Sequence, residues 1–130
     1  MTRSTKKPLK TRKKNDEAGD KVRIAIAQIN TIVGDFPHNV EQIKNCLREA
    51  KESRADIILF PELTLTGYPP EDLLLKKDFV KKNLSALKSL ARYTKGITAV
   101  IGFAEPVKNQ IYNSAALIAN GKYLGSYQEM

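Results

Sequence analysis

The sequence predicts an α/β fold in which strand–helix units lead into antiparallel strands. Two short runs rich in Ile, Val and Leu, residues 22–30 and 56–60, have the composition of buried strands. Each is followed by a segment whose apolar residues recur at helical spacing. Three more strand-like runs follow closely, the last two joined by Asn120-Gly121, a strong hairpin signal. The expected order over residues 21–130 is therefore β-α-β-α-β-β-β.

The first strand–helix unit begins with the alternating run 22–30. The segment "TIVGDFPHN" after it contains glycine and proline breakers and predicts a loop. We expect Asn39 to cap the following helix, which should end near Ser53-Arg54. The run 56–60 is continuously apolar, which is typical of a strand buried on both faces.

The second helical region, residues 71–95, is predicted to form two pieces. Leu73 and Leu74 anchor the first piece, and Gly96 ends the second. The second piece has one apolar face, made of Phe79, Val80, Leu84, Leu87, Leu90 and Ala91. The lysines at 76, 77, 81, 82 and 88 are expected to face solvent. The remaining strands are predicted at 97–105, 111–119 and 122–128.

The charge of the chain is concentrated at its N-terminus. The net charge is +8, and residues 1–14 hold seven Lys/Arg and no acid. Residues 1–20 contain almost no apolar side chains, so we expect a disordered tail before a domain at 21–130. The body is only mildly basic, so nucleic-acid binding is not expected beyond weak contact by this tail.

Composition excludes several classes of protein. No apolar stretch is long enough to span a membrane, and no apolar region follows the basic N-terminus as in a secretory signal. The single cysteine, Cys46, excludes an internal disulfide and fits a reducing, cytoplasmic compartment. Cys46 lies beside the apolar stripe of the first helix, which favours an inert core role. His38 is alone in the predicted loop, which favours a surface or capping role over metal binding.

The chemistry-bearing stretch is "IILFPELTLTGYPPE", residues 57–71. Glu62 comes just past the end of a buried strand, where α/β sheets tend to place ligand sites. Partial burial would raise its pKa toward neutrality, which suits a general base. From the residues alone, an exposed loop acid or a capping acceptor remains open. Tyr68 could line a pocket or pack its ring on the strand ends. The chain has no glycine-rich phosphate loop.

Together these segments resemble a known family. "RIAIAQINTIVGDFPHNVEQI" followed by "ADIILFPELTLTGYPPEDLL" is similar to the opening of the nitrilase, or carbon–nitrogen hydrolase, superfamily. "GYPPEDLL" is most similar to the glutamine amidase domains of glutamine-dependent NAD⁺ synthetases. "VIGFAEP", "IYNSAALIANGK" and "GSY" continue in the expected order. The resemblance covers about residues 21–130.

This resemblance implies the N-terminal portion of an α-β-β-α sandwich that hydrolyses glutamine to glutamate and ammonia. Such enzymes use a Glu–Lys–Cys triad, and Glu62 falls on the general base. Tyr68 falls on a tyrosine that lines the glutamine pocket. ATP and Mg²⁺ are expected only for a separate synthetase domain, and none is expected in this segment. The family is homo-oligomeric.

The sequence departs from the family pattern near its end. The family lysine follows the last strand, and Glu129 stands in that register; the family cysteine is expected beyond residue 130. We therefore expect the 130-residue chain to be inactive alone, which leaves its status as an enzyme open. The alternatives are a non-catalytic partner subunit, paired with a downstream fragment or synthetase domain, and a fragment of another nitrilase-family hydrolase.

Overall fold

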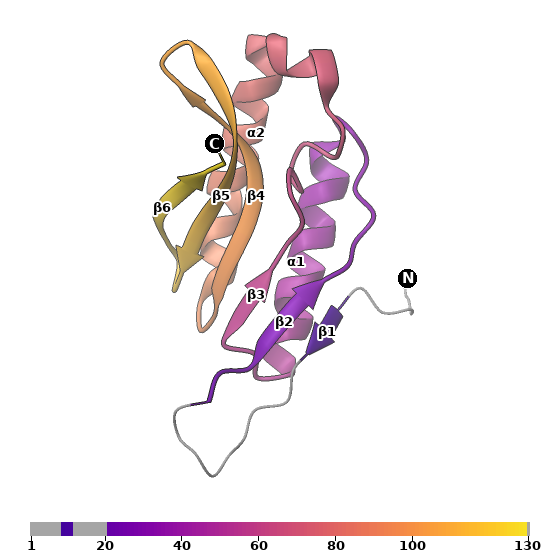
Figure 1. Ribbon diagram of the computed structural model, residues 1–130. Helices are drawn as coiled ribbons and strands as arrows, with labels where there is room; N and C mark the ends of the chain where they lie inside the picture. Colours follow the sequence, from indigo (N-terminus) through magenta and orange to yellow (C-terminus); the bar gives the residue numbers. More distant parts are fainter. Residues whose placement is uncertain (1–8, 12–20, 130) are drawn as a thin grey trace.

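The computed structural model describes residues 9–11 and 21–129. Within them, six strands form one sheet, and two helices pack on one of its faces (Figure 1). The helices are α1 (Phe36–Glu52) and α2 (Lys77–Leu90). The strands are β1 (Leu9–Thr11), β2 (Ile24–Ala27), β3 (Ile57–Leu59), β4 (Thr98–Val107), β5 (Gln110–Ala119) and β6 (Lys122–Gln128).

The strands lie in the sheet in the order in which they occur in the chain. β2, β3 and β4 are parallel, and β4, β5 and β6 are antiparallel. The predicted element order over residues 21–129 is therefore confirmed. The β5–β6 turn is also confirmed, because Asn120 and Gly121 have φ values of 51° and 83°, and a type I′ turn needs positive φ at both positions.

The expectation of a disordered tail is wrong for Leu9–Thr11. These residues form β1, which pairs antiparallel with β2, Leu9 opposite Ala27 and Thr11 opposite Ala25. The open edge of a strand offers backbone N–H and C=O groups, so a segment can pair there without an apolar side-chain pattern. The rest of the predicted tail, residues 1–8 and 12–20, lies outside the described residues.

The first helix begins earlier than predicted. Asp35 is the N-cap, and its Oδ1 accepts a hydrogen bond from the His38 backbone N at 3.0 Å. Asn39 is therefore inside α1 rather than at its cap, and His38 lies in the first turn rather than in a loop. Pro37 falls in that first turn, where a missing N–H costs nothing. The end at Ser53, the C-cap, is as predicted.

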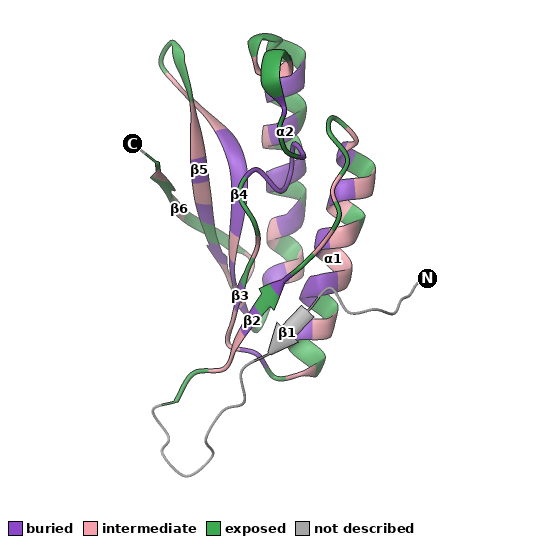
Figure 2. Cartoon of the chain, turned by 45° about the vertical axis from the view of Figure 1, so that its right-hand side comes forward, coloured by how far each residue is buried: buried purple, intermediate pink, exposed green. Residues whose placement is uncertain are grey.

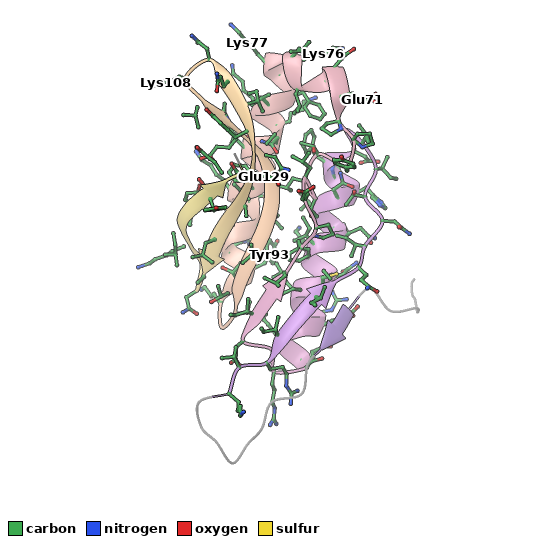
Figure 3. All side chains as sticks on the ribbon, viewed as in Figure 1. Glu71, Lys76, Lys77, Tyr93, Lys108 and Glu129 are labelled. Carbon is green, nitrogen blue, oxygen red and sulfur yellow. The ribbon has the colours of Figure 1, made fainter. Side chains whose placement is uncertain are left out.

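The second helical region forms two pieces as predicted. A short 3₁₀ segment, η1 (Glu71–Leu75), precedes α2, and a second one, η2 (Ala91–Thr94), follows it. Gly96 lies just beyond with a φ of 81°, which suits glycine. The five lysines expected to face solvent are exposed. Lys76 and Lys77 lie at the start of α2 (Figure 3).

The two faces of the sheet differ in burial. On the helix side, Ile58, Ile101 and Phe103 are at most 1% exposed. We call the opposite side the open face; it carries Ile26, Leu59, Leu117 and Tyr127. Leu59 is 37% exposed, so the expectation that β3 is buried on both faces is wrong for this chain. The reason is that both helices lie on one side of the sheet. β6, at the edge of the sheet, is largely exposed (Figure 2).

Among the described residues, no helix has the length and apolar character needed to cross a membrane.

Candidate active site

Glu62 lies where the chain leaves the sheet at the end of β3. The Phe60 N–H still donates to the Val100 carbonyl of β4 at 3.0 Å, and the Leu65 N–H donates to the Gly102 carbonyl at 3.3 Å. Between these two bonds, residues 61–64 leave the edge of β4. We call this segment, which carries Glu62, the excursion. The Glu62 side chain is exposed. It is therefore free to meet a group brought to it from outside the described residues.

Gly102 sets how closely this excursion approaches the sheet. A Cβ at Gly102 would lie 2.5 Å from both the Leu63 N and the Pro61 O. Ile101 and Phe103 face the helices, so the Cβ direction of Gly102 points to the open face. The segment around Glu62 thus lies against the open face, and only glycine leaves room for it there.

The other side of the excursion is held by the loop before α1. The Gly34 N–H donates to the Thr66 carbonyl at 2.9 Å. A Cβ at Gly67 would meet the Val33 Cα at 2.7 Å, and Gly67 has a φ of 80°, so the two loops are in backbone contact. Tyr68, next in the chain, is 66% exposed. The segment from Pro61 to Tyr68 is therefore gripped from two sides and presents Glu62 and Tyr68 to solvent.

Side chains at the C-terminal end of β6 point to the same open face. Gly102 pairs with Ala115, which pairs with Tyr127 in β6. The Glu129 N–H donates to the Asn113 carbonyl at 2.9 Å, and the Asn113 amide donates to Glu129 Oε1 at 2.8 Å. Tyr127 and Glu129 therefore lie two strand spacings from the Glu62 segment, or about 10 Å. Glu129, labelled in Figure 3, therefore has its carboxylate bound to the Asn113 amide.

Comparison with known proteins identifies the family. The family model for carbon–nitrogen hydrolases matches residues 23–130. The chain belongs to this family. It is 38% identical over 112 residues to the glutamine-dependent NAD(+) synthetase of Thermotoga maritima, covering 85% of this chain and 19% of that protein. It is also 38% identical over 108 residues to the Acinetobacter baylyi synthetase, covering 82% and 20%.

Solved structures agree with this assignment. A glutamine-dependent NAD(+) synthetase from Cytophaga hutchinsonii superposes with a TM-score of 0.81 at 29% identity, over 84% of this chain and 19% of that one. An amidase from Nesterenkonia sp. superposes with a TM-score of 0.75 at 28% identity, over 83% and 42%. That amidase, also solved as a cysteine-to-serine variant, is a member of the nitrilase superfamily. The resemblance and the fold class read from the sequence are therefore confirmed.

The match to the synthetases is partial in length. This carbon–nitrogen hydrolase chain spans about a fifth of the curated synthetases that it matches. It spans somewhat less than half of the solved amidase. The activity, substrates and partners of those longer proteins are therefore matters for proposal in this chain.

Cys46 lies in the core, away from Glu62. Its side chain is 0% exposed on the helix side of the sheet, opposite the face on which Glu62 lies. Burial, and secondly the charge of Glu49, raise the pKa of the thiol to about 12. Because the thiolate is the reactive form, a thiol that stays protonated at neutral pH is inert. The core role predicted for Cys46 is confirmed.

His38 is held by hydrogen bonds to the loop before α1. Its Nε2 lies 3.1 Å from the Asn30 carbonyl O, and its backbone N is held by Asp35. Throughout the described part of the chain, no three His, Cys, Asp or Glu side chains gather in a way that could hold a metal ion.

Sequence reasoning missed three residues that shape the site. Gly102 reads as an ordinary strand glycine, and Asn39 as a helix cap. Asn83 reads as a polar interruption of an apolar helix face, yet it is 0% exposed. Its Oδ1 accepts from the Ala104 N at 3.2 Å, and its Nδ2 donates to the Ala104 O. Asn83 thus replaces the strand partner that β4 loses when β3 ends. A buried Asn within an apolar stripe was the available signal.

Proposed function

We propose that this chain is the base-bearing segment of a glutamine amidase domain that supplies ammonia for NAD⁺ synthesis. In this proposal Glu62 is the general base and Tyr68 lines the pocket for glutamine. The observation that carries it is the position of Glu62: an exposed carboxylate on a doubly gripped segment at the end of a parallel strand. That position occurs in a carbon–nitrogen hydrolase chain that is 38% identical to glutamine-dependent NAD(+) synthetases.

The proposed chemistry is acyl transfer through a cysteine. Glu62 accepts the proton of a cysteine thiol as the sulfur attacks the amide carbon of glutamine, and a thioester forms. Glu62 then gives that proton to the departing ammonia. Water hydrolyses the thioester to glutamate. A solved form of the Nesterenkonia amidase carries acrylamide added to its active-site cysteine, which supports a cysteine nucleophile in this family.

The remaining groups are proposed to come from outside the described residues. Cys46 is buried on the helix side and burial raises the pKa of its thiol, so the proposed nucleophile belongs to another segment or chain. ATP and Mg²⁺ are proposed to serve only the synthetase part that consumes the ammonia. Glu129 cannot stabilise a developing oxyanion as a lysine would, because its charge has the wrong sign. A cytoplasmic location, with glutamine as substrate, completes the proposal.

A chimera tests the assignment of Glu62. Residues 21–128 of this chain replace the matching segment of the Thermotoga maritima synthetase, whose own residues continue from there. We expect the chimera to hydrolyse glutamine, and Glu62→Gln to lower that rate about 100-fold or more. NAD⁺ formation from added ammonium should be unchanged by Glu62→Gln, which serves as the control for the synthetase part. Full glutaminase activity in the Glu62→Gln chimera would exclude Glu62 as the base.

The 130-residue chain by itself is expected to show no glutaminase turnover, because its only thiol is unreactive. Turnover that disappears with Glu62→Gln in the isolated chain would contradict this.

A second candidate is a non-catalytic partner subunit. The exposed apolar side chains of the open face favour it, since Ile26 is 50% and Leu117 40% exposed. Co-purification of the chain with the remaining part of a matching amidase domain would support a partner role. A monodisperse monomer that ignores such a fragment would exclude it.

A further inference from the structure

Asn39 joins the two loops that grip the Glu62 segment. It lies in the first turn of α1 and is 0% exposed. Its Oδ1 accepts from the Ile32 N at 2.8 Å, and its Nδ2 donates to the Ile32 O at 2.9 Å and to the Leu65 O at 2.9 Å. One side chain therefore binds both loops at once and uses both of its N–H donors to do so.

The neighbouring backbone bond reinforces this junction. Gly34 N–H donates to the Thr66 carbonyl, one residue along from the Leu65 carbonyl that Asn39 binds. We call the three hydrogen bonds of the Asn39 side chain, together with the Gly34–Thr66 backbone bond, the clamp. The clamp fixes the chain three to four residues after Glu62. Gly102 fixes it on the other side of Glu62, at Pro61 and Leu63.

We propose that Asn39 is a positioning residue for Glu62, acting through the clamp. The chemistry is specific to an asparagine amide. An aspartate keeps the acceptor for the Ile32 N–H, but it presents a second oxygen in place of the amide that donates to the Ile32 and Leu65 carbonyls. The Ile32 carbonyl keeps the Asp35 N–H as a donor, but the buried Leu65 carbonyl is left facing a carboxylate, which drives the loops apart. That the positioned group is a catalytic base rests on the proposed function; that Asn39 holds its segment does not.

The competing explanation is that Asn39 only stabilises the fold as a whole. Thr94 supplies a matched control, because it is also 0% exposed and also joins distant loops. Its Oγ1 donates to the Ala91 O at 2.7 Å and accepts from the Gly121 N at 2.9 Å. Thr94→Val removes these bonds at the β5–β6 turn, while Asn39→Asp removes bonds at the clamp.

Amide hydrogen exchange by NMR on the 130-residue chain separates the two explanations. In Asn39→Asp we expect the amides of Gly34, Leu65 and Gly67 to exchange about tenfold faster or more, with the β4–β5 ladder unchanged. The ¹³C shift of the Glu62 carboxyl should move as well. In Thr94→Val, neither the exchange of the Gly34, Leu65 and Gly67 amides nor the Glu62 carboxyl shift should change. Equal acceleration of every amide in Asn39→Asp, or an unmoved Glu62 signal, would overturn the proposal.

A measurement on the unaltered chain covers the case in which Asn39→Asp does not fold. The two Asn39 side-chain N–H protons should exchange about tenfold more slowly or more than those of Asn109, which is exposed. Exchange of the Asn39 side chain as fast as that of Asn109 shows that the clamp is not formed, and sinks the proposal. Glutaminase activity enters neither test, so failure here is distinct from failure of Glu62→Gln in the chimera.

Discussion

The helix-covered face and the open face of the sheet are built from similar residues but end in different environments. Ile118 and Leu117 are neighbours in β5, yet Ile118 is 1% exposed and Leu117 is 40% exposed. Ile58 and Leu59 in β3 show the same contrast, at 0% and 37%. Alternation along a strand sends consecutive side chains to opposite faces, and α1 and α2 cover only one of them.

This contrast locates the site as well as the core. The helix side holds the packed core and the inert Cys46. The open face holds the groups proposed for chemistry, with the Glu62 segment lying against Gly102 and Glu129 two strands away. The residues that stabilise the core and those proposed for chemistry therefore lie on opposite faces of one sheet. Substitutions on the two faces should therefore have different consequences.

The largest expected effect comes from the matched pair in β5. Ile118→Ala removes a buried side chain and leaves a cavity, so it should lower the free energy of unfolding by about 2–5 kcal/mol. Leu117→Ala, next to it, should cost about 1 kcal/mol or less, because its side chain is already partly in water. Urea unfolding of both variants measures the difference. Similar losses for the two would mean that the open face is covered in solution.

Gly102→Ala should have a smaller effect that is confined to the open face. Its Cβ meets backbone atoms rather than a flexible side chain, so the Glu62 segment must shift. We expect a loss of about 1–3 kcal/mol in stability, in the range of overpacking. Amide chemical shifts should change over residues 61–66 and stay constant in α1. Wild-type stability together with wild-type shifts in that segment would show that the close approach is absent.

The buried thiol gives a pH-dependent test of the helix side. The pKa of Cys46 is raised from 9.0 to about 12 in the folded chain. Above pH 9 the unfolded chain therefore binds fewer protons than the folded chain, and stability falls as the pH rises. The expected loss is about 1.4 kcal/mol between pH 8 and pH 10.

Cys46→Ala isolates this contribution from any other pH dependence of the stability. The difference in unfolding free energy between the two chains should shrink with rising pH by that amount. A difference that stays constant from pH 8 to pH 10 would mean that the thiol is accessible. Maleimide labelling of the native chain at pH 8 should accordingly be slow, and fast in denaturant.

Much of the fold was predictable because local signals and packing agree. The Asn120-Gly121 turn needs two positive φ values, and few other dipeptides supply them. The two-piece helix over 71–95 follows from its apolar face and from Gly96. The position of Glu62 just past the end of a strand was also predictable. These features depend on residues within one turn or one strand.

What was not predictable depends on contacts between distant segments. Asn39 looks like a helix cap, but Asp35 takes that role, and Asn39 binds Leu65, 26 residues away. β1 carries no apolar pattern that would predict a strand, and it is defined by its backbone pairing with β2. The exposure of Leu59 reflects what covers the sheet, which no single strand encodes.

The smallest expected effect concerns β6, whose residues are mostly exposed. The Oδ1 of Asn120 accepts from the Gly96 N–H at 2.9 Å and so ties the β5–β6 turn to the end of the second helical region. Asn120→Gly keeps the positive φ that the turn needs but removes this bond. We expect a loss of about 0.5–1 kcal/mol, the net value of an exposed hydrogen bond. Amide exchange should accelerate in β6 and stay unchanged in β4, because β4 is held by β3, β5 and Asn83. Equal acceleration in both strands would show that β6 opens only with the whole sheet, so that its exposure does not make it a separate unit.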